Sequence, residues 1–322
     1  MKNYFEGEKM SLLLLNKIGS FYIGGGNAEI SGKPVYQRQF VLGGPMREVD
    51  PNGDFESGQM YVQYFLQEDP ISDYPILLMH GGGMCGSCWE NAPDNSEGWL
   101  QYFLQEKYHV YVADAVERGR SGWSQFPEIY KSEPIFRSKK EAWKTFRIGS
   151  HYDSDPQKRV ALAGTQFPVE HFDYFMKSNV PRWTTNNAAI LAAYEDCLTR
   201  IGPTVLILHS QGSEFGMQLV RKYPELVKAA VFLEPSSTPF KEACASDVPI
   251  LYVWGDYLNG TNWEKYEKNV RVYYEKQVAA GNNVTWLSLP EKGIYGNSHF
   301  LMLDRNNREI FNIVADWLQK IS

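Results

Sequence analysis

The pattern of hydrophobic and polar positions changes near residue 75. Before it, residues 20–66 alternate short apolar stretches, at 21–23, 35–42 and 60–66, with Gly-rich turns, which is typical of antiparallel strands. After it, fully apolar runs alternate with longer amphipathic segments, as in a parallel sheet covered by helices on both faces. We therefore predict an α/β fold: a mostly parallel, doubly wound sheet with an antiparallel N-terminal edge.

The predicted elements of the parallel part follow one another regularly. Strands are expected at 76–79, 110–113, 205–208, 229–233, 250–254 and 284–289. Helices are expected at 99–106, 188–200, 213–222, 263–280 and 306–320. The alternation stops between 122 and 187, where prolines lie among large aromatic residues. We predict that 1–121 and 188–322 form the core and that 122–187 is an inserted helical cap over the carboxyl ends of the strands, where open α/β sheets bind ligands.

The charge and the hydrophobic runs of the chain argue against nucleic-acid and membrane partners. The chain has 322 residues and a formal charge of −6, and its Lys and Arg residues are scattered, so we expect no nucleic-acid partner. No apolar run approaches the roughly 18 residues of a membrane helix. The Leu run at 12–15 follows mixed charges and is shorter than the roughly 7 residues of a secretory signal core. We expect no membrane partner and a cytoplasmic location, with a periplasmic location and a homodimer left open.

The sequence leaves open whether two nearby cysteines form a disulfide and whether the aromatic residues of the predicted cap line a pocket. Cys85 and Cys88 form a Cys-x-x-Cys pair, but the other cysteines are far apart and have no His at metal-site spacing. Free thiols are favoured, with a Cys85–Cys88 disulfide as the alternative in an oxidising compartment, and no metal or organic cofactor is implied. The cap aromatics suit an apolar substrate pocket or packing against the core, and packing is favoured. These aromatics are Trp143, Phe167, Phe172 and Trp183.

Ser210 follows the apolar run at 204–208 and precedes a predicted helix. A sharp turn there would lift its hydroxyl off the sheet and aim the first helical amides at the oxygen of an acyl group. Ser210 is therefore a candidate nucleophile, although Ser also commonly caps helices. Leu208 stands where such turns usually have a small residue, so we expect it to crowd the turn.

Three further segments supply partners for a serine nucleophile. The loop 80–83, His-Gly-Gly-Gly, follows a predicted strand, and its glycines would expose amides that bind an oxyanion. His299 lies in a loop beyond the last strand, from which it can reach back to Ser210. The acid is either Glu234 or Asp256, because each ends a strand at the same edge of the sheet.

Several motifs resemble those of the Alcaligenes-type bacterial esterases, a small family of α/β hydrolases. The resemblance runs from about residue 59 to the C-terminus, and the motifs that carry it are 80–90, 165–169, 209–211, 231–235, 296–299 and 304–307. It implies the α/β-hydrolase fold and a Ser-Glu-His triad whose acid lies one strand earlier than usual. The family has an adjacent Cys-Cys pair in the oxyanion loop. This chain has Gly82-Gly83 instead, so a vicinal disulfide is not expected.

The resemblance assigns roles to individual residues. It implies Ser210 as nucleophile, His299 as base and Glu234 as acid, with the amides of Gly82 and Gln211 forming the oxyanion hole. We predict a serine hydrolase that cleaves small-molecule carboxylic esters through an acyl-enzyme intermediate. Two alternatives stay open: a non-catalytic ligand-binding protein with a hydrolase fold, and a hydrolase of amides, lactones or C–C bonds.

Overall fold

The computed structural model describes residues 13–321, and its centre is an eight-stranded sheet. The strands are β1 (Leu15–Ile30), β4 (Gly53–Gln67), β5 (Ile76–Met79), β6 (Val110–Asp114), β9 (Thr204–His209), β10 (Val227–Leu233), β11 (Ile250–Trp254) and β12 (Val284–Ser288). Their order is β1-β4-β6-β5-β9-β10-β11-β12. The strands from β6 to β12 in this order are parallel, whereas β4 and β1 pair antiparallel. The predicted sheet, including its antiparallel N-terminal edge, is confirmed.

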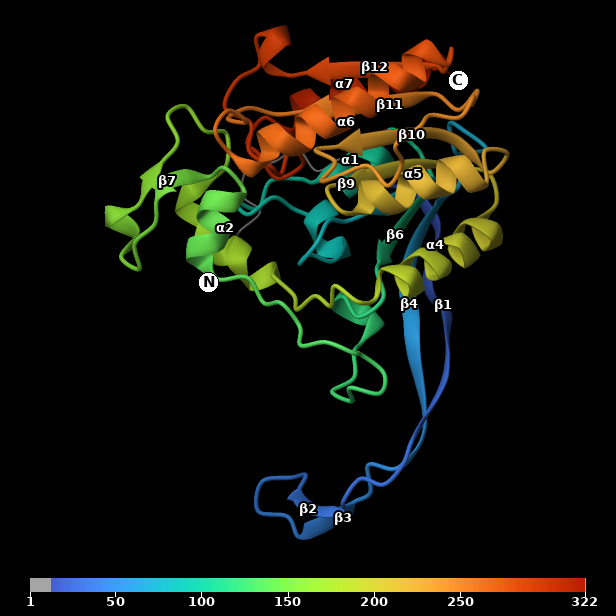
Figure 1. Ribbon diagram of the computed structural model, residues 1–322, viewed down its shortest axis with the longest axis vertical. Coiled ribbons are helices and arrows are strands. Elements are labelled where there is room, and N and C mark those ends of the chain that lie inside the picture. The colour runs from blue at the N-terminus through green and yellow to red at the C-terminus, as the bar shows by residue number, and fades with distance from the viewer. Residues whose placement is uncertain (1–12, 322) are drawn as a thin grey trace.

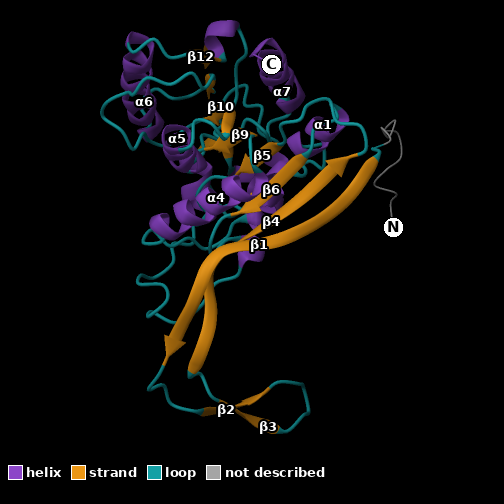
Figure 2. Cartoon of the chain, turned by 90° about the vertical axis from the view of Figure 1, so that its right-hand side faces the viewer, coloured by secondary structure: helices purple, strands orange, loops and turns teal. Residues whose placement is uncertain are grey.

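Helices cover both faces of the sheet. Helices α1 (Trp99–Gln105) and α7 (Asn307–Ile321) lie on one face, and α4 (Asn187–Ile201), α5 (Gly212–Lys222) and α6 (Asn262–Ala279) lie on the other (Figure 2). Alternate residues of a strand point to opposite faces. In β5, Ile76 and Leu78 pack into the core layer beneath α1 and α7, while Leu77 and Met79 pack into the other layer. Burial on both faces explains why the sequence of β5 is continuously apolar.

Strands β1 and β4 are far longer than predicted, and their distal halves leave the body of the protein as an arm (Figures 1 and 2). Gly24 and Gly25 in β1 and Gly58 in β4 have φ near +70°, a conformation that glycine adopts readily. At the end of the arm, β2 (Tyr36–Gln39) and β3 (Met46–Val49) form a separate two-stranded ribbon. The expected strand at 35–42 is therefore not part of the sheet edge.

The segment 122–187 lies beside the carboxyl ends of the parallel strands (Figure 1). It contains α2 (Lys139–Thr145), β7 (Gly149–His151), β8 (Val160–Ala161) and α3 (Phe172–Phe175), with 3₁₀ turns at Pro156–Lys158, Val169–His171 and Met176–Ser178. The remaining 3₁₀ turns are Gly86–Trp89, Gly119–Ser121 and Pro290–Lys292. The four cap aromatics named above are buried, as packing requires. We propose that 122–187 is a cap and that the rest of the chain is the core.

Candidate active site

Ser210 lies at the junction of β9 and α5 with a φ of +53°. A residue with a side chain rarely adopts this left-handed conformation, which costs on the order of 1–3 kcal/mol. The amide of Ser210 donates to Leu233 O at 2.9 Å, which holds the turn against β10. At Gly212 a Cβ atom would lie 2.8 Å from His80 O, so glycine lets α5 begin close to β5. The sharp turn expected at Ser210 is present.

Leu208 does not crowd this turn, and that sequence expectation is wrong. A Cβ atom at Gly216, one turn into α5, would overlap Leu208 Cδ2. The branched end of the fully buried Leu208 therefore occupies the space that the missing side chain leaves in the helix. The small residue that the close helix–strand approach needs is on the helix instead of the strand.

We expect Gly216→Ala to lower the free energy of unfolding by about 1–3 kcal/mol, because the added methyl group overpacks this contact. Urea denaturation measures the change. In a Leu208→Ala background the same substitution should cost less, since the colliding atoms are gone. Equal losses in the two backgrounds would show that the two side chains do not compete for one space.

The Gly-rich loop that follows β5, the candidate oxyanion loop, is held by His80. The ring accepts a hydrogen bond from Ala115 N at Nε2 (3.0 Å), so Nδ1 carries the proton and donates to Gly81 O (2.8 Å). Burial, reinforced by the nearby Arg118, lowers the pKa of His80 to about 4, and the ring is neutral at pH 7. A Cβ atom at Gly81 would lie 2.8 Å from Ser210 Cβ. The loop is therefore packed directly against the candidate nucleophile.

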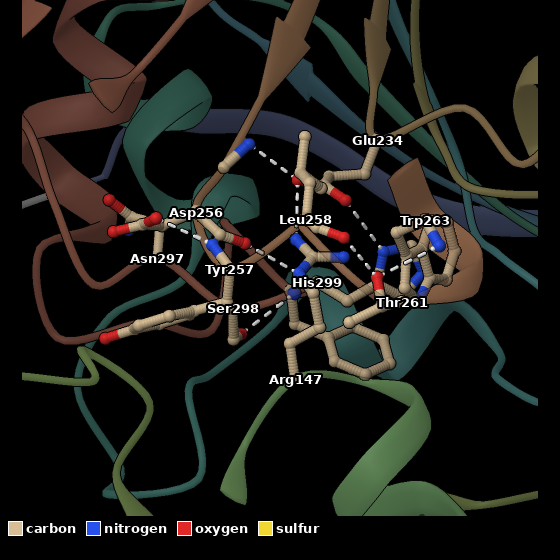
Figure 3. A network of polar contacts seen from close by, with 12 residues as sticks. Arg147, Glu234, Asp256, Tyr257, Leu258, Thr261, Trp263, Asn297, Ser298 and His299 are labelled. Atoms are coloured by element: carbon tan, nitrogen blue, oxygen red, sulfur yellow. Dashed lines mark hydrogen bonds and ion pairs between the residues drawn. The ribbon is translucent and has the colours of Figure 1, made fainter. Parts of the chain in front are cut away.

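His299 and Glu234 form a buried pair. His299 Nδ1 is 3.3 Å from Glu234 Oε2, and the imidazole is 3.8 Å from the ring of Trp263 between centroids (Figure 3). His209 Nε2 donates to His299 O at 2.9 Å, and the two histidine rings are 4.5 Å apart between centroids. The loop that carries His299 is thus bonded to the residue next to Ser210.

The candidate nucleophile and base are linked through His209, the residue before Ser210. Within residues 13–321, no hydrogen bond joins the Ser210 hydroxyl to the His299 imidazole. Catalytic hydrogen bonds are often long without substrate and tighten when it binds. The structure therefore brings His299 together with Glu234 and places Ser210 next to His209, whose ring contacts His299.

The two candidate acids differ in what their carboxylates bind. Glu234 is fully buried, and its Oε1 accepts from Arg147 Nη2 (2.8 Å) and Gly255 N (2.5 Å), which leaves Oε2 for His299. Burial raises the pKa of Glu234, and the charge of Arg147 opposes that rise. Asp256 instead accepts from the amides of Tyr257 (2.7 Å) and Gly296 (2.9 Å), so it organises two loops.

Arg147 is a residue that the sequence analysis missed. It lies in the segment 122–187, has a φ of +57° and is almost fully buried. Besides Glu234, its guanidinium donates from Nε to Asp256 O (2.7 Å) and lies 5.4 Å from the centre of the Trp263 ring (Figure 3). An Arg in an irregular insertion has no spacing that relates it to Glu234, so no sequence pattern could have found it.

A second buried carboxylate fixes the loop that carries His299. Asp304 accepts hydrogen bonds from Ser298 Oγ (2.7 Å), Ser298 N (2.8 Å) and Asn297 Nδ2 (3.0 Å). Burial raises the pKa of Asp304 to about 7 in spite of these donors. The motifs at 296–299 and 304–307 are thus joined in one hydrogen-bonded turn.

The environment of His299 predicts the pH dependence of activity. Burial lowers the pKa of its imidazole well below 6.5, and the charges of Arg147 and Arg137 add to the shift. A general base acts in its neutral form, so kcat/KM should hold down to pH 6.5 and fall only as the pH passes through the lowered pKa. Initial rates from pH 4 to 8 measure this. Half-maximal kcat/KM at or above pH 6.5 would contradict the prediction.

The control for that profile is the stability of the protein at each pH. The unfolded chain binds a proton at His299 near pH 6.5, whereas the folded chain does not. The stability that the neutral ring contributes is therefore complete above pH 6.5 and is lost as the pH falls below that value. Circular dichroism at each pH separates loss of fold from loss of the base.

Comparisons with known proteins find relatives that are named as a lipase and an esterase. No protein-family model matches the chain. The chain is 27% identical over 327 residues to the probable secreted lipase phiG of a fungus (strain ATCC 74256), a match that covers 83% of this chain and 88% of the lipase. The structure is similar to that of a bacterial esterase with a TM-score of 0.81 and 29% sequence identity, covering 97% of this chain and 98% of the esterase.

Proposed function

We propose that this chain, an α/β hydrolase with an esterase as its structural counterpart, is a serine esterase that cleaves small-molecule carboxylic esters. The observation that carries the proposal is the convergence at one sheet edge of a Ser in a left-handed turn, a Gly-rich loop and a buried His-Glu pair. Ester hydrolysis needs these three parts: a nucleophile, oxyanion donors and an oriented base.

In the mechanism that we propose, the hydroxyl of Ser210 attacks the ester carbonyl and its proton passes to Nε2 of His299. The amides of Gly82 and Gln211 bind the oxygen as it becomes negative. The imidazolium then protonates the leaving alcohol, which departs and leaves an acyl-enzyme. Water, deprotonated by His299, attacks the acyl group and releases the acid and Ser210. Glu234 holds Nδ1–H throughout and stabilises the imidazolium.

Arg147 supports this sequence by fixing Glu234. Its ion pair occupies Oε1, so Oε2 is the oxygen that faces the imidazole. The same positive charge opposes the rise in the pKa of Glu234 that burial causes, which favours the ionised acid. We propose Arg147 as a positioning residue, because it acts through Glu234 and not on the substrate.

Covalent labelling tests the proposed nucleophile. An alkyl fluorophosphonate should add one phosphonyl group to the protein, and peptide mass spectrometry should locate it on Ser210. p-Nitrophenyl acetate should be hydrolysed with an initial burst of p-nitrophenol, because the acyl-enzyme forms before it is cleaved. A protein that neither labels nor hydrolyses esters would instead be the non-catalytic ligand-binding alternative.

We further propose that the protein is a homodimer formed through its arm. The end of the arm exposes Phe40, Val41 and Leu42, whose exposed fractions are 62%, 70% and 99%. Arg38 and Arg47 face each other across β2 and β3, and neither forms an ion pair within the described residues. Like charges at this distance repel, and a second copy of a chain with net charge −6 can supply the missing carboxylates.

The double substitution Phe40→Ser with Leu42→Ser should convert the dimer into a monomer, so that light scattering after size exclusion gives half the mass. The substituted residues are at the end of the arm, so kcat/KM should not change. Val272→Ser, at a 55% exposed position on α6, is the matched control and should stay dimeric. A wild-type monomer at all concentrations, or a dimeric double variant, would refute the proposed interface.

The location of the protein stays a prediction. None of the described helices is long and apolar enough to cross a membrane. The charged segment before the Leu run at 12–15, on which the expected cytoplasmic location depends, lies outside the described residues. The fungal relative is named as a secreted protein, and cell fractionation distinguishes the two locations.

A further inference from the structure

One strand-like part of the cap, residues 179–182, crosses the oxyanion loop. Val180 N donates to Gly83 O at 2.9 Å, and a Cβ atom at Gly83 would lie 3.3 Å from Asn179 Oδ1. Arg182 exchanges two backbone hydrogen bonds with Ile135, at 2.7 and 3.0 Å. These bonds on both sides fix the backbone of Arg182 above the loop.

The guanidinium of Arg182 is packed against the proposed oxyanion hole. A Cβ atom at Gly82 would lie 2.6 Å from Arg182 Nη1 and 3.1 Å from Gln211 Oε1. Because a carbon–carbon bond is about 1.5 Å long, Nη1 is within about 4 Å of Gly82 Cα. The cation therefore lies beside both residues whose amides would bind the oxyanion.

No carboxylate of the described chain neutralises Arg182. Its guanidinium forms no hydrogen bond or ion pair within residues 13–321, and its Nε is buried without a partner. The nearby Glu117 is engaged by Arg118 and Asn186, and Glu214 accepts from Ser236.

This isolation is unfavourable for the protein alone. Burial, together with the charge of Arg118, lowers the pKa of Arg182. The guanidinium is half-buried, with its Nε fully buried, and a partly desolvated charge without a counter-ion is unfavourable. An anion brought by the substrate would therefore be attracted to this position. The charge of Arg137 also lowers the pKa of Arg182, although Arg137 Nη1 is itself paired with Glu141 Oε1 at 2.5 Å.

We infer that Arg182 is a specificity residue that binds a carboxylate of the substrate, so the preferred substrates are half-esters of short dicarboxylic acids. This inference rests on the proposed esterase function. A guanidinium binds a carboxylate through two parallel hydrogen bonds. With the scissile carbonyl oxygen at the amides of Gly82 and Gln211, the proximity of Arg182 requires the carboxylate to be only a few bonds from that carbonyl.

The test compares an anionic and a neutral ester of the same acid. Monomethyl succinate and dimethyl succinate are hydrolysed by the wild type and by Arg182→Gln, and proton release is followed in a pH-stat. The wild type should prefer the half-ester. In Arg182→Gln the ratio of kcat/KM for the half-ester to that for the diester should fall by about 30- to 100-fold, the size of a charged hydrogen-bonded pair. Arg182→Lys keeps the positive charge but not the two parallel N–H donors of the guanidinium. In this variant the same ratio should fall less.

The controls separate this inference from the esterase function itself. Arg271→Gln, which removes a surface guanidinium from α6, should keep the wild-type ratio. If Arg182→Gln slows both esters equally, the cation serves the oxyanion or the fold, and the inference is wrong. A wild type that prefers the diester also overturns it, while the esterase function stands. If the wild type cleaves neither succinate ester nor p-nitrophenyl acetate, the esterase function itself fails.

Discussion

Replacing Ser210 with Ala should lower kcat/KM for p-nitrophenyl acetate by about 10⁴- to 10⁶-fold, because the acyl-enzyme can no longer form. The residual rate would come from the oxyanion amides and from substrate binding alone. Initial rates with purified wild type and variant measure the loss, and fluorophosphonate labelling should disappear with it. The fold should persist, since Ala fits wherever Ser does and the turn at position 210 is held by backbone hydrogen bonds.

Ser213→Ala is the matched control for that substitution. Ser213 is a buried serine in the first turn of the same helix, and its hydroxyl has only a long contact, 3.5 Å, with Leu208 O. It should retain activity within a few fold of the wild type. A Ser210→Ala variant that also stays within a few fold would end the claim that Ser210 is the nucleophile.

Glu234→Gln should reduce kcat by about 10³- to 10⁴-fold, the scale seen when the acid of a serine triad loses its charge. An amide cannot stabilise the imidazolium, and it leaves the buried Arg147 without a counter-ion. The second effect should lower the free energy of unfolding by about 3–5 kcal/mol. Asp256→Asn should affect kcat much less, because Asp256 binds loop amides and not His299. The reverse order of losses would make Asp256 the acid.

A double variant separates chemistry from folding in that experiment. Adding Arg147→Met to Glu234→Gln removes the stranded charge, so the free energy of unfolding should recover in part. The turnover number should not recover, because the imidazolium still has no carboxylate. Recovery of both quantities would mean that the single variant lost activity only by losing its fold.

The strands and helices with a regular pattern of apolar positions could be predicted from the sequence. The strand Ile76–Met79 and the helix Asn307–Ile321 were found because burial imposes one pattern on strands and another on helices. The candidate site could be predicted because Ser210, Glu234 and His299 each follow a strand of the same sheet. Spacing left Glu234 and Asp256 as equal candidates, and the family resemblance favoured Glu234. In the structure the two carboxylates differ in their contacts, which spacing does not encode.

The features that the sequence analysis missed depend on contacts between distant segments. The arm is long although none of residues 13–321 covers its end, so burial gave no signal of its length. Leu208 on the strand fills the space that Gly216 leaves on the helix. Leu208 considered alone therefore predicted a crowded turn that the structure does not have. Arg147 and Arg182 come from an insertion without periodicity, and only the fold shows that each one lies beside a residue of the site.

The ion pair between Arg147 and Glu234 has a consequence for protein engineering. Segment 122–187 supplies the guanidinium that pairs with Glu234, the proposed acid, and also Phe146 O, which accepts a hydrogen bond from the amide of His299. Exchanging only the segment 122–187 between related proteins would therefore not transfer their substrate specificity. A chimaera would need to carry over the guanidinium at position 147 with its backbone conformation, or turnover would be lost together with the original selectivity.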